Sequence, residues 1–402
     1  MPERTSLRRE AGVEQHATTL ELFYDLVFVF AVTQVSHLLL GHLTWEGAGQ
    51  AAMVLLVVWW SWNYTTWVTN ELDPESIVVR LLLIALMLGS LLMAIAIPGA
   101  FGDRALLFAG SYVAIQVGRH LFLTFVAAEH GTIERLRAAR ILTWFVAAGA
   151  LWIAGALVDG TGRTALWLAA LAIDYGGPLV TFWVPVRGPM ASHGWWNVGT
   201  EHFAERFQLF IIIALGESIV ITGATTADLD LTAARVAGLG LAFLATAALW
   251  WLYFNLVAAV AQRRLAEAAD RTLMARDAYT YLHVVIVAGI LLSAVGDELV
   301  IAHPTEELGD AELIAVVCGP ALYLLAHVAL RLRMTGALSH RRLAGAVACL
   351  AVGAIGTFAP ALVIAALLLG VLVAVIVGDQ VAAQRRRRRG EPSLLERIAT
   401  AG

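Results

Sequence analysis

The sequence predicts an all-α polytopic membrane protein with about 12 transmembrane helices, and three observations support this prediction. Of the 402 residues, 59% are hydrophobic and only 14% are charged, whereas a soluble domain carries about 25% charged residues. Apolar runs of about 20 residues, the length that crosses a bilayer as a helix, recur along the whole chain. Finally, all 27 basic residues other than histidine are arginine, and most of them fall in alternate connections between these runs.

The apolar runs define twelve candidate spans, each long enough to cross the hydrocarbon core as a helix. The last two spans are separated only by the short break at Phe358, Ala359 and Pro360. In chain order, the spans are 22–43, 47–68, 77–97, 104–128, 138–158, 163–185, 203–224, 233–257, 276–299, 311–332, 339–358 and 360–380.

The arginines indicate the orientation of these spans, because cytoplasmic loops are enriched in positive charge. With both termini in the cytoplasm, 23 arginines lie on the inner side and one, Arg119, lies within a span. The outer side carries only Arg104, Arg163 and Arg235. An odd number of missed or extra spans would scramble so uneven a distribution, so we expect both termini to be cytoplasmic.

A weak internal repeat relates the first and seventh spans. Three positions match at an offset of 180, namely Phe23 with Phe203, Asp25 with Glu205 and His37 with Glu217. The second and eighth spans each carry an aromatic cluster followed by an asparagine, Asn63 and Asn255. Because spans one and seven run in the same direction, the sequence predicts two parallel six-helix repeats, an arrangement that transporters use.

This repeat predicts how the chain is divided, and no connection is long enough for a soluble domain. Five arginines in a row, Arg385 to Arg389, form a topology signal or attract anionic lipid headgroups. The predicted parts are a cytoplasmic N-terminal segment 1–20, a first six-helix repeat 21–185, a connecting loop 186–202, a second six-helix repeat 203–380 and a basic cytoplasmic tail 381–402.

The first span carries the polar residues from which we expect function. Glu21 and Asp25 lie one helical turn apart at its start, and Ser36 and His37 lie near its other end. A charge deep in a membrane helix costs roughly 3 kcal/mol or more, so it faces a partner or a wet cavity. Asp25 therefore either fixes the helix at the cytoplasmic interface or forms an ion or proton site at the mouth of a pathway.

The seventh span repeats this pattern, with Glu205 and Arg206 at its start and Glu217 and Ser218 past its middle. Arg206 and Glu217 share a face but are about 16 Å apart along the axis, too far to pair. Glu217 must therefore find a partner on another helix or stay protonated. His202 and Glu205 are one turn apart, which suits a metal, but polar residues are common at an interface and no metal site is predicted.

Further polar residues in apolar spans are candidate partners. Arg119 and His120 lie inside span four, and we expect Arg119 to pair with Asp25 or Glu217. Asn63 and Asn255 occupy matching places in spans two and eight. Asp174, just before Gly176, Gly177 and Pro178, indicates a break in span six of the kind that borders substrate sites.

Several classes of protein are disfavoured. The chain has no phosphate-binding glycine loop, no His-Glu-x-x-His helix and no Gly-x-Ser-x-Gly turn, so we expect neither an enzyme nor a cofactor. Cys318 and Cys349 both lie in apolar spans and predict no disulfide framework. The Trp-rich and Arg-rich stretches fit membrane interfaces and cytoplasmic loops, not a nucleic-acid surface.

Two motifs resemble the bacterial low temperature requirement A (LtrA) family. The first is ELFYDLVFVFA at 21–31, followed by Thr33, Gln34, Ser36 and His37; the second is ERF at 205–207 with ALGES at 214–218. The resemblance implies a multi-pass protein of the bacterial inner membrane, linked to growth in the cold. Phe23-Tyr24-Asp25 is also similar to the Phe-Ser-Asp first-helix motif of the endosomal and lysosomal potassium-channel family, with tyrosine in place of serine.

We therefore expect a transporter or permease for a small solute or ion, with Asp25, Arg119 and Glu217 as the ionisable core of its pathway. Acids in such a pathway take up and release protons as access alternates. A passive cation channel lined by spans one and seven is an alternative. A non-transporting scaffold or assembly factor, whose buried charges only specify packing, is another.

Overall fold

The computed structural model describes residues 7–9, 16–185, 188–190, 196 and 198–391. The predicted N-terminal segment, connecting loop and tail fall partly outside these ranges. Arg4, Arg187 and Arg397, which contributed to the predicted orientation, also lie outside the described residues.

Within these ranges the chain is helical, and its extended contacts are three isolated β-bridges. Nine helices among the described residues are long and apolar enough to cross a membrane. This confirms an all-α polytopic membrane protein, while the count of twelve crossings and the two repeats stay predictions. The elements are α1 Thr19–Gly41, α2 Trp45–Thr69, α3 Ile77–Ala96, η1 Ile97–Gly99, α4 Ala105–Phe122, η2 Leu123–Ala127, α5 Ile133–Ala156, α6 Gly160–Leu179, α7 Thr200–Ala227, α8 Ala233–Leu252, η3 Tyr253–Val257, α9 Ala258–Ala266, α10 Arg271–Met274, η4 Ala275–Tyr281, α11 Leu282–Ala302, α12 Asp310–Thr335, α13 His340–Gly356 and α14 Ala361–Arg388.

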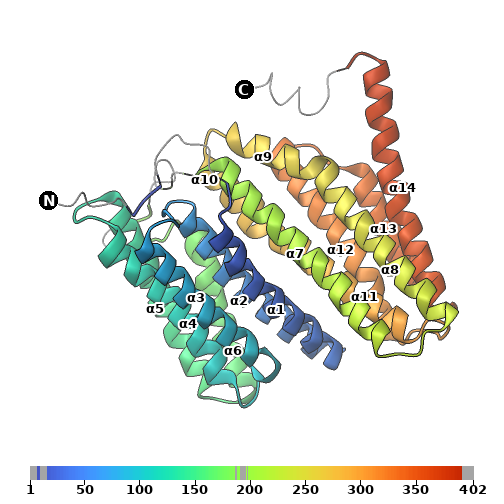
Figure 1. The fold of residues 1–402 in the computed structure, drawn as a ribbon, viewed down its shortest axis with the longest axis horizontal. Coiled ribbons are helices and arrows are strands. Elements are labelled where there is room, and N and C mark those ends of the chain that lie inside the picture. The colour runs from blue at the N-terminus through green and yellow to red at the C-terminus, as the bar shows by residue number, and fades with distance from the viewer. Residues whose placement is uncertain (1–6, 10–15, 186–187, 191–195, 197, 392–402) are drawn as a thin grey trace. The chain divides into compact units, whose positions relative to one another are not determined.

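The helices pack into two compact units. The first consists of Met1–Leu38 and Gly49–Arg206, and the second of Leu39–Ala48 and Phe207–Gly402. Both α1 and α7 therefore contribute residues to each unit. In the first unit, α3, α4, α5 and α6 lie side by side in chain order, because short connections join antiparallel neighbours (Figure 1).

Helix α2 forms the buried centre of the first unit. Its side chains reach α1, α4 and α6: the Tyr24 hydroxyl donates to Thr65, Arg119 donates to the Ser61 carbonyl, and Trp60 stacks on Tyr175. Such an enclosed helix needs no lipid-facing surface, so it carries polar residues at little cost. This explains why α2 is not among the nine strongly apolar helices, although it is long enough to cross.

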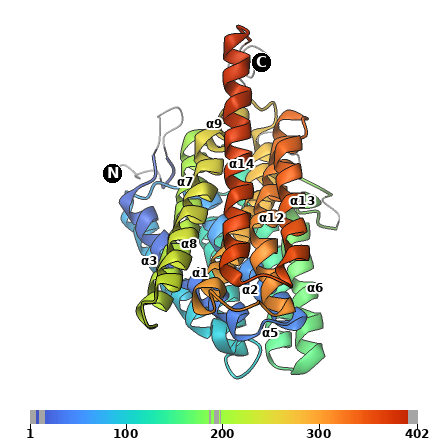
Figure 2. The same ribbon diagram turned by 90° about the vertical axis from the view of Figure 1, so that its right-hand side faces the viewer.

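In the second unit, α8, α11, α12, α13 and α14 form a closed ring, with α14 returning to pack against α8. Figure 2 shows α14 running beside α8 and α13. The tightest contact is between α11 and α12, where two glycines allow the backbones to meet. A Cβ atom added to Gly289 would lie 2.6 Å from the Tyr323 nitrogen, and one added to Gly319 would lie 2.5 Å from the Ser293 nitrogen.

Three segments among the described residues are π-helical: η2, which ends α4, and η3 and η4, which continue into α9 and α11. Such segments are rare and are frequently found at functional sites. In the second unit, η3 and η4 bring Tyr253 and Tyr279 next to His283, whose ring lies parallel to Tyr279 and bonds the Tyr253 hydroxyl.

The sequence predicted a break in span six, 163–185, beside Gly176, Gly177 and Pro178, and the helix ends within this span. Helix α6 continues through Gly176 and Gly177 and ends at Leu179, with Pro178 in its last turn. Proline has no backbone N–H and its ring crowds the preceding turn, which accounts for a helix that ends next to Pro178.

Candidate functional site

The candidate site begins with a short antiparallel bridge that holds Arg9 at the end of α2. The Arg9 amide donates to the Glu71 carbonyl, and the Asp73 amide donates to the Leu7 carbonyl. The Arg9 Nε atom donates to the carbonyls of Thr69 and Leu72, at 2.9 and 3.0 Å. These bonds fix the guanidinium so that its other nitrogens face α1.

Glu21 and His202 form the first of two buried acid–base pairs between α1 and α7. His202 Nε2 lies 2.9 Å from Glu21 Oε1, and both side chains are fully buried. The other carboxylate oxygen, Oε2, accepts from Arg9 Nη2 at 3.1 Å and from the amide and hydroxyl of Thr18 at 2.9 and 3.0 Å. Both oxygens of this carboxylate therefore have partners.

The surroundings of His202 fix which of its nitrogens carries the proton. The Gly199 amide donates to Asn70 Oδ1, and Asn70 Nδ2 donates to the Gly199 carbonyl, which sets the orientation of the Asn70 amide group. Asn70 Nδ2 also lies 3.0 Å from His202 Nδ1, so Nδ1 must accept. Nε2 has two neighbours: the acceptor Glu21 Oε1 at 2.9 Å and the donor Arg9 Nη2 at 3.1 Å, which itself donates to Glu21 Oε2. With Nδ1 accepting, we assign His202 as a neutral imidazole that donates from Nε2 to the nearer of the two, Glu21.

Asp25 and Arg206 form the second pair, one helical turn further along both helices. Arg206 Nη2 lies 2.6 Å from Asp25 Oδ1, which also accepts from Trp62 Nε1 at 2.8 Å. Both charged side chains are buried. Asp25 Oδ2 and Arg206 Nε and Nη1 are buried without a hydrogen-bond partner in the part of the chain that the structure describes.

The two pairs together make what we call the acid–base ladder: Glu21, Asp25, His202 and Arg206. Its rungs are four residues apart on each helix, which places them about 6 Å apart along the axes. Equal spacing on both helices brings each acid opposite one base. The ladder lies wholly within the first unit.

The sequence predicted that Arg119 pairs with Asp25 or Glu217, but Asp25 pairs with Arg206. The buried partner of Asp25 is Arg206, whereas Arg119 donates to neutral oxygens: the Ser61 carbonyl at 3.3 Å, the Thr65 hydroxyl at 3.0 Å and the Gln116 side chain. Several neutral acceptors can hold a guanidinium in place of one carboxylate, because it has five N–H donors.

Two more predicted residues of the first unit lie in buried polar contacts. The carboxylate of Asp174 accepts from the Tyr112 hydroxyl at 2.8 Å and from Trp152 Nε1 at 2.9 Å. His120 is buried, with Nδ1 2.9 Å from the Gln116 carbonyl. These contacts tie α4, α5 and α6 together and are separate from the ladder.

The remaining predicted residues are divided by burial. Ser36, Asn63, Glu217 and Ser218 are buried. Glu205 is half-buried and accepts from the Ala17 amide at 2.9 Å. His37 and Asn255 are exposed.

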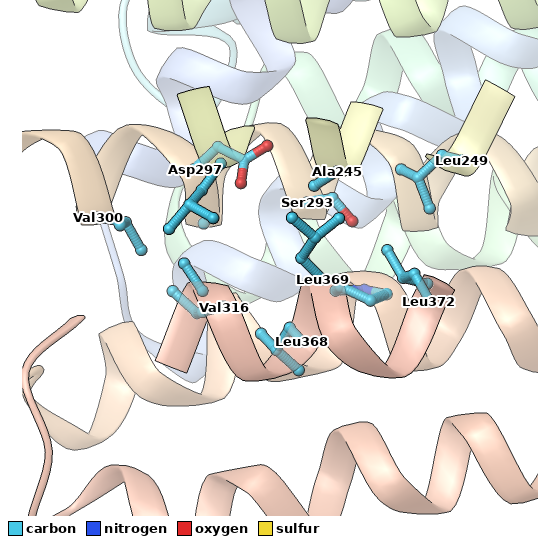
Figure 3. A pocket seen from close by; sticks show the side chains of 13 residues that line it. Ala245, Leu249, Ser293, Asp297, Val300, Val316, Leu368, Leu369 and Leu372 are labelled. Atoms are coloured by element: carbon cyan, nitrogen blue, oxygen red, sulfur yellow. The ribbon is translucent and has the colours of Figure 1, made fainter. Parts of the chain in front are cut away.

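A further acid, Asp297 of α11, borders a small cavity of the second unit. Asp297 and Ser293, one turn apart on α11, line this cavity together with Val316 and leucines of α14 (Figure 3). The cavity measures about 20 Å³, enough for about one water molecule.

Sequence reasoning missed Arg9, Trp62, His202 and Asn70 as parts of the site. Arg9 had been counted only as a topology signal, and His202 had been placed at a polar interface. One signal was available: His202 precedes Arg206 by four residues, the same spacing as Glu21 and Asp25. Matched spacing of acids and bases on two helices predicts facing pairs.

The protonation of His202 gives a first testable prediction. Asn70→Asp replaces the donor facing Nδ1 by an acceptor, so we expect a doubly protonated imidazolium at neutral pH where the wild type has only the Nε2–H form. Side-chain ¹⁵N spectra of histidine-labelled protein measure this directly, with His202→Gln to assign the signal. The same Nε2–H spectrum in both proteins would contradict the assigned hydrogen bonds.

Fold and site together define a multi-pass α-helical membrane protein with a buried acid–base cluster joining α1 and α7. The profile of the family described as Bacterial low temperature requirement A protein (LtrA) matches residues 16–377, nearly the whole chain. The chain belongs to this family, which confirms the resemblance seen in the two motifs.

One relative is a protein of Rhizobium meliloti (strain 1021) named "Uncharacterized protein RA0937". It is 39% identical over 323 residues, which cover 79% of this chain and 78% of the relative. No solved structure matches the chain.

Proposed function

We propose that this protein is a transporter or permease for a small ion or solute, and that the acid–base ladder is its proton-binding element. The observation that supports this most is the Asp25–Arg206 rung, with three buried polar atoms that lack partners among the described residues. Ionisable residues inside membrane helices mark ion and proton pathways.

An incompletely bonded ion pair is a poor packing device. Breaking even one contact of a buried charge is costly, and a partly satisfied polar network is worse for stability than an apolar core. Water or a polar solute beside Asp25 Oδ2 and Arg206 Nη1 would supply the missing bonds. The rung therefore suits a site that exchanges hydrogen-bond partners during function.

Protonation of Asp25 would remove the charge that holds Arg206. Of the two ladder pairs, His202 with Glu21 would then be the one that still holds the start of α7 to α1, so one proton would weaken this attachment. Glu217, about 16 Å beyond Arg206 along the axis of α7, is a buried acid of the second unit and the second proton site that we propose. If Asp25 and Glu217 were protonated in turn, proton movement would be coupled to the opening of the solute site to one side of the membrane and then the other.

The test is proton flux in liposomes that contain purified protein and an internal pH dye, under an imposed proton gradient. We expect Asp25→Asn and Glu217→Gln each to reduce flux at least about tenfold, because a neutral amide cannot carry the proton. The matched control is Glu75→Gln, which removes an exposed carboxylate that pairs with Arg80 and should leave flux unchanged. Wild-type flux that persists in both buried variants would refute the proposal.

The Glu21–His202 pair favours a second candidate function, a non-transporting scaffold. Both carboxylate oxygens of Glu21 have hydrogen-bond partners, so this pair can serve to hold α1 and α7 together. If the protein were a scaffold, the wild type would conduct no protons. Asp25→Asn and Glu217→Gln would still restore growth at low temperature to cells that lack the protein. A transporter would lose both flux and complementation.

We also propose that the protein resides in the bacterial inner membrane with both termini in the cytoplasm. This rests on the distribution of arginine between alternate connections. In that orientation the ladder lies near the cytoplasmic ends of α1 and α7.

A further inference from the structure

A cavity in the second unit combines buried donors with a group of arginines. It has a volume of about 290 Å³ and lies between η3, α9, α12, α13 and α14. Asn255, predicted from the sequence as a pathway residue, is part of its wall. The charged and imidazole side chains that line it are His327, Arg331, Arg342, Asp379, Arg386, Arg387 and Glu391.

The buried end of this cavity presents hydrogen-bond donors. Arg342 Nη1 lies 3.0 Å from His327 Nδ1, and since an arginine can only donate, this nitrogen must accept. The proton of the neutral imidazole is therefore on Nε2. That N–H and the Nε–H of Arg342 are both buried and have no hydrogen-bond partner in the described residues. Two unused donors at one site call for an acceptor.

The charge around the cavity also favours an anion. Four arginines line it against two carboxylates, and one of these, Asp379, is 3.3 Å from Arg341 and 3.5 Å from Arg342. Arg386 and Arg387 reach the cavity because α14 stays helical to Arg388. Two arginines of the basic tail thus line a cavity, whereas the sequence alone indicated only a cluster of positive charge.

We propose that this cavity binds a phosphate-type anion, either the phosphodiester headgroup of a membrane lipid or free inorganic phosphate. Arginine is suited to such an anion, because its planar group donates two parallel bonds to phosphate oxygens. Arg386 and Arg387, half-buried and exposed, and the buried Arg342 and His327 would together supply its donors. The site contains none of the ladder residues, and Asn255 is the one predicted pathway residue in its lining.

The tail provides matched variants that separate a built site from general attraction of positive charge. Arg386→Gln/Arg387→Gln removes two arginines that line the cavity, and Arg385→Gln/Arg388→Gln removes two exposed neighbours that do not. Both variants lose the same charge from the same helix end. Because these side chains are exposed or half-buried, both proteins should fold.

The experiment uses full-length protein in neutral detergent and measures the thermal shift produced by dioctanoyl phosphatidylglycerol and, separately, by inorganic phosphate at constant ionic strength. We expect the cavity variant to weaken binding about tenfold or more, through loss of two charge-assisted contacts, and the control variant to change it less than about twofold. A thermal shift produced by inorganic phosphate identifies a soluble anion as the ligand. A thermal shift produced by the lipid and not by inorganic phosphate identifies a lipid headgroup. Equal loss in the two variants, or no shift of the wild type with either probe, would overturn the proposal.

Discussion

Arg206→Leu is expected to lower the free energy of unfolding by about 3–5 kcal/mol, the cost of leaving one partner of a buried ion pair uncompensated. Asp25 would keep its bond from Trp62 but lose the guanidinium nitrogen of Arg206 that lies 2.6 Å from Oδ1. Thermal unfolding in detergent measures the loss. Because the side chains of both partners are almost fully buried, solvent cannot replace the missing charge.

A second substitution separates this effect from simple loss of packing. Asp25→Asn in the Arg206→Leu background removes the stranded charge and should recover most of the lost stability. The control is Arg80→Leu, which breaks an exposed pair with Glu75 and should cost less than about 1 kcal/mol. If Arg206→Leu were as mild as Arg80→Leu, Asp25 and Arg206 would not be a buried pair.

Gly319→Ala is expected to destabilise the second unit by about 3 kcal/mol, the upper end of the usual range for over-packing. The added methyl group would lie 2.5 Å from the Ser293 nitrogen and 2.7 Å from its Cα atom. Those are backbone atoms of α11 and cannot turn aside as a side-chain end can, so the two helices must separate. Thermal unfolding again measures the effect.

Gly370→Ala is the matched control for this substitution. Gly370 lies in α14 with nothing within 4 Å of an added Cβ atom. Alanine is the better helix former by up to about 1 kcal/mol, so this variant should be neutral or more stable. A destabilised Gly370→Ala together with a neutral Gly319→Ala would contradict the described packing of α11 and α12.

The sequence predicted the helices well because each one is a local pattern. Long apolar runs identify the spans wherever a helix faces lipid, and even the enclosed α2 contains such a run in its middle, from Ala51 to Trp60. Asp25, Glu217 and Arg119 were correctly expected to be buried, since lipid exposure of a charge is costly.

The partners of the buried charges could not be predicted in the same way. Either Arg119 or Arg206 suits Asp25 by chemistry, and only the packing of α1 against α2 and α7 decides between them. Arg9 was beyond reach for a different reason: it belongs to no helix and approaches Glu21 through a bridge to the end of α2. Periodicity carries no information about such a contact.

The position of Arg9 has a thermodynamic consequence. Since Arg9 contacts Glu21 from a segment outside the helices, the state of that segment and the state of the carboxylate are linked, and linkage is reciprocal. Whatever draws residues 7–9 away from α2 must ease protonation of Glu21, and protonation of Glu21 must release residues 7–9 by the same free energy. Displacement of residues 7–9 would therefore change the protonation of Glu21, and the position of these residues would indicate whether Glu21 is protonated.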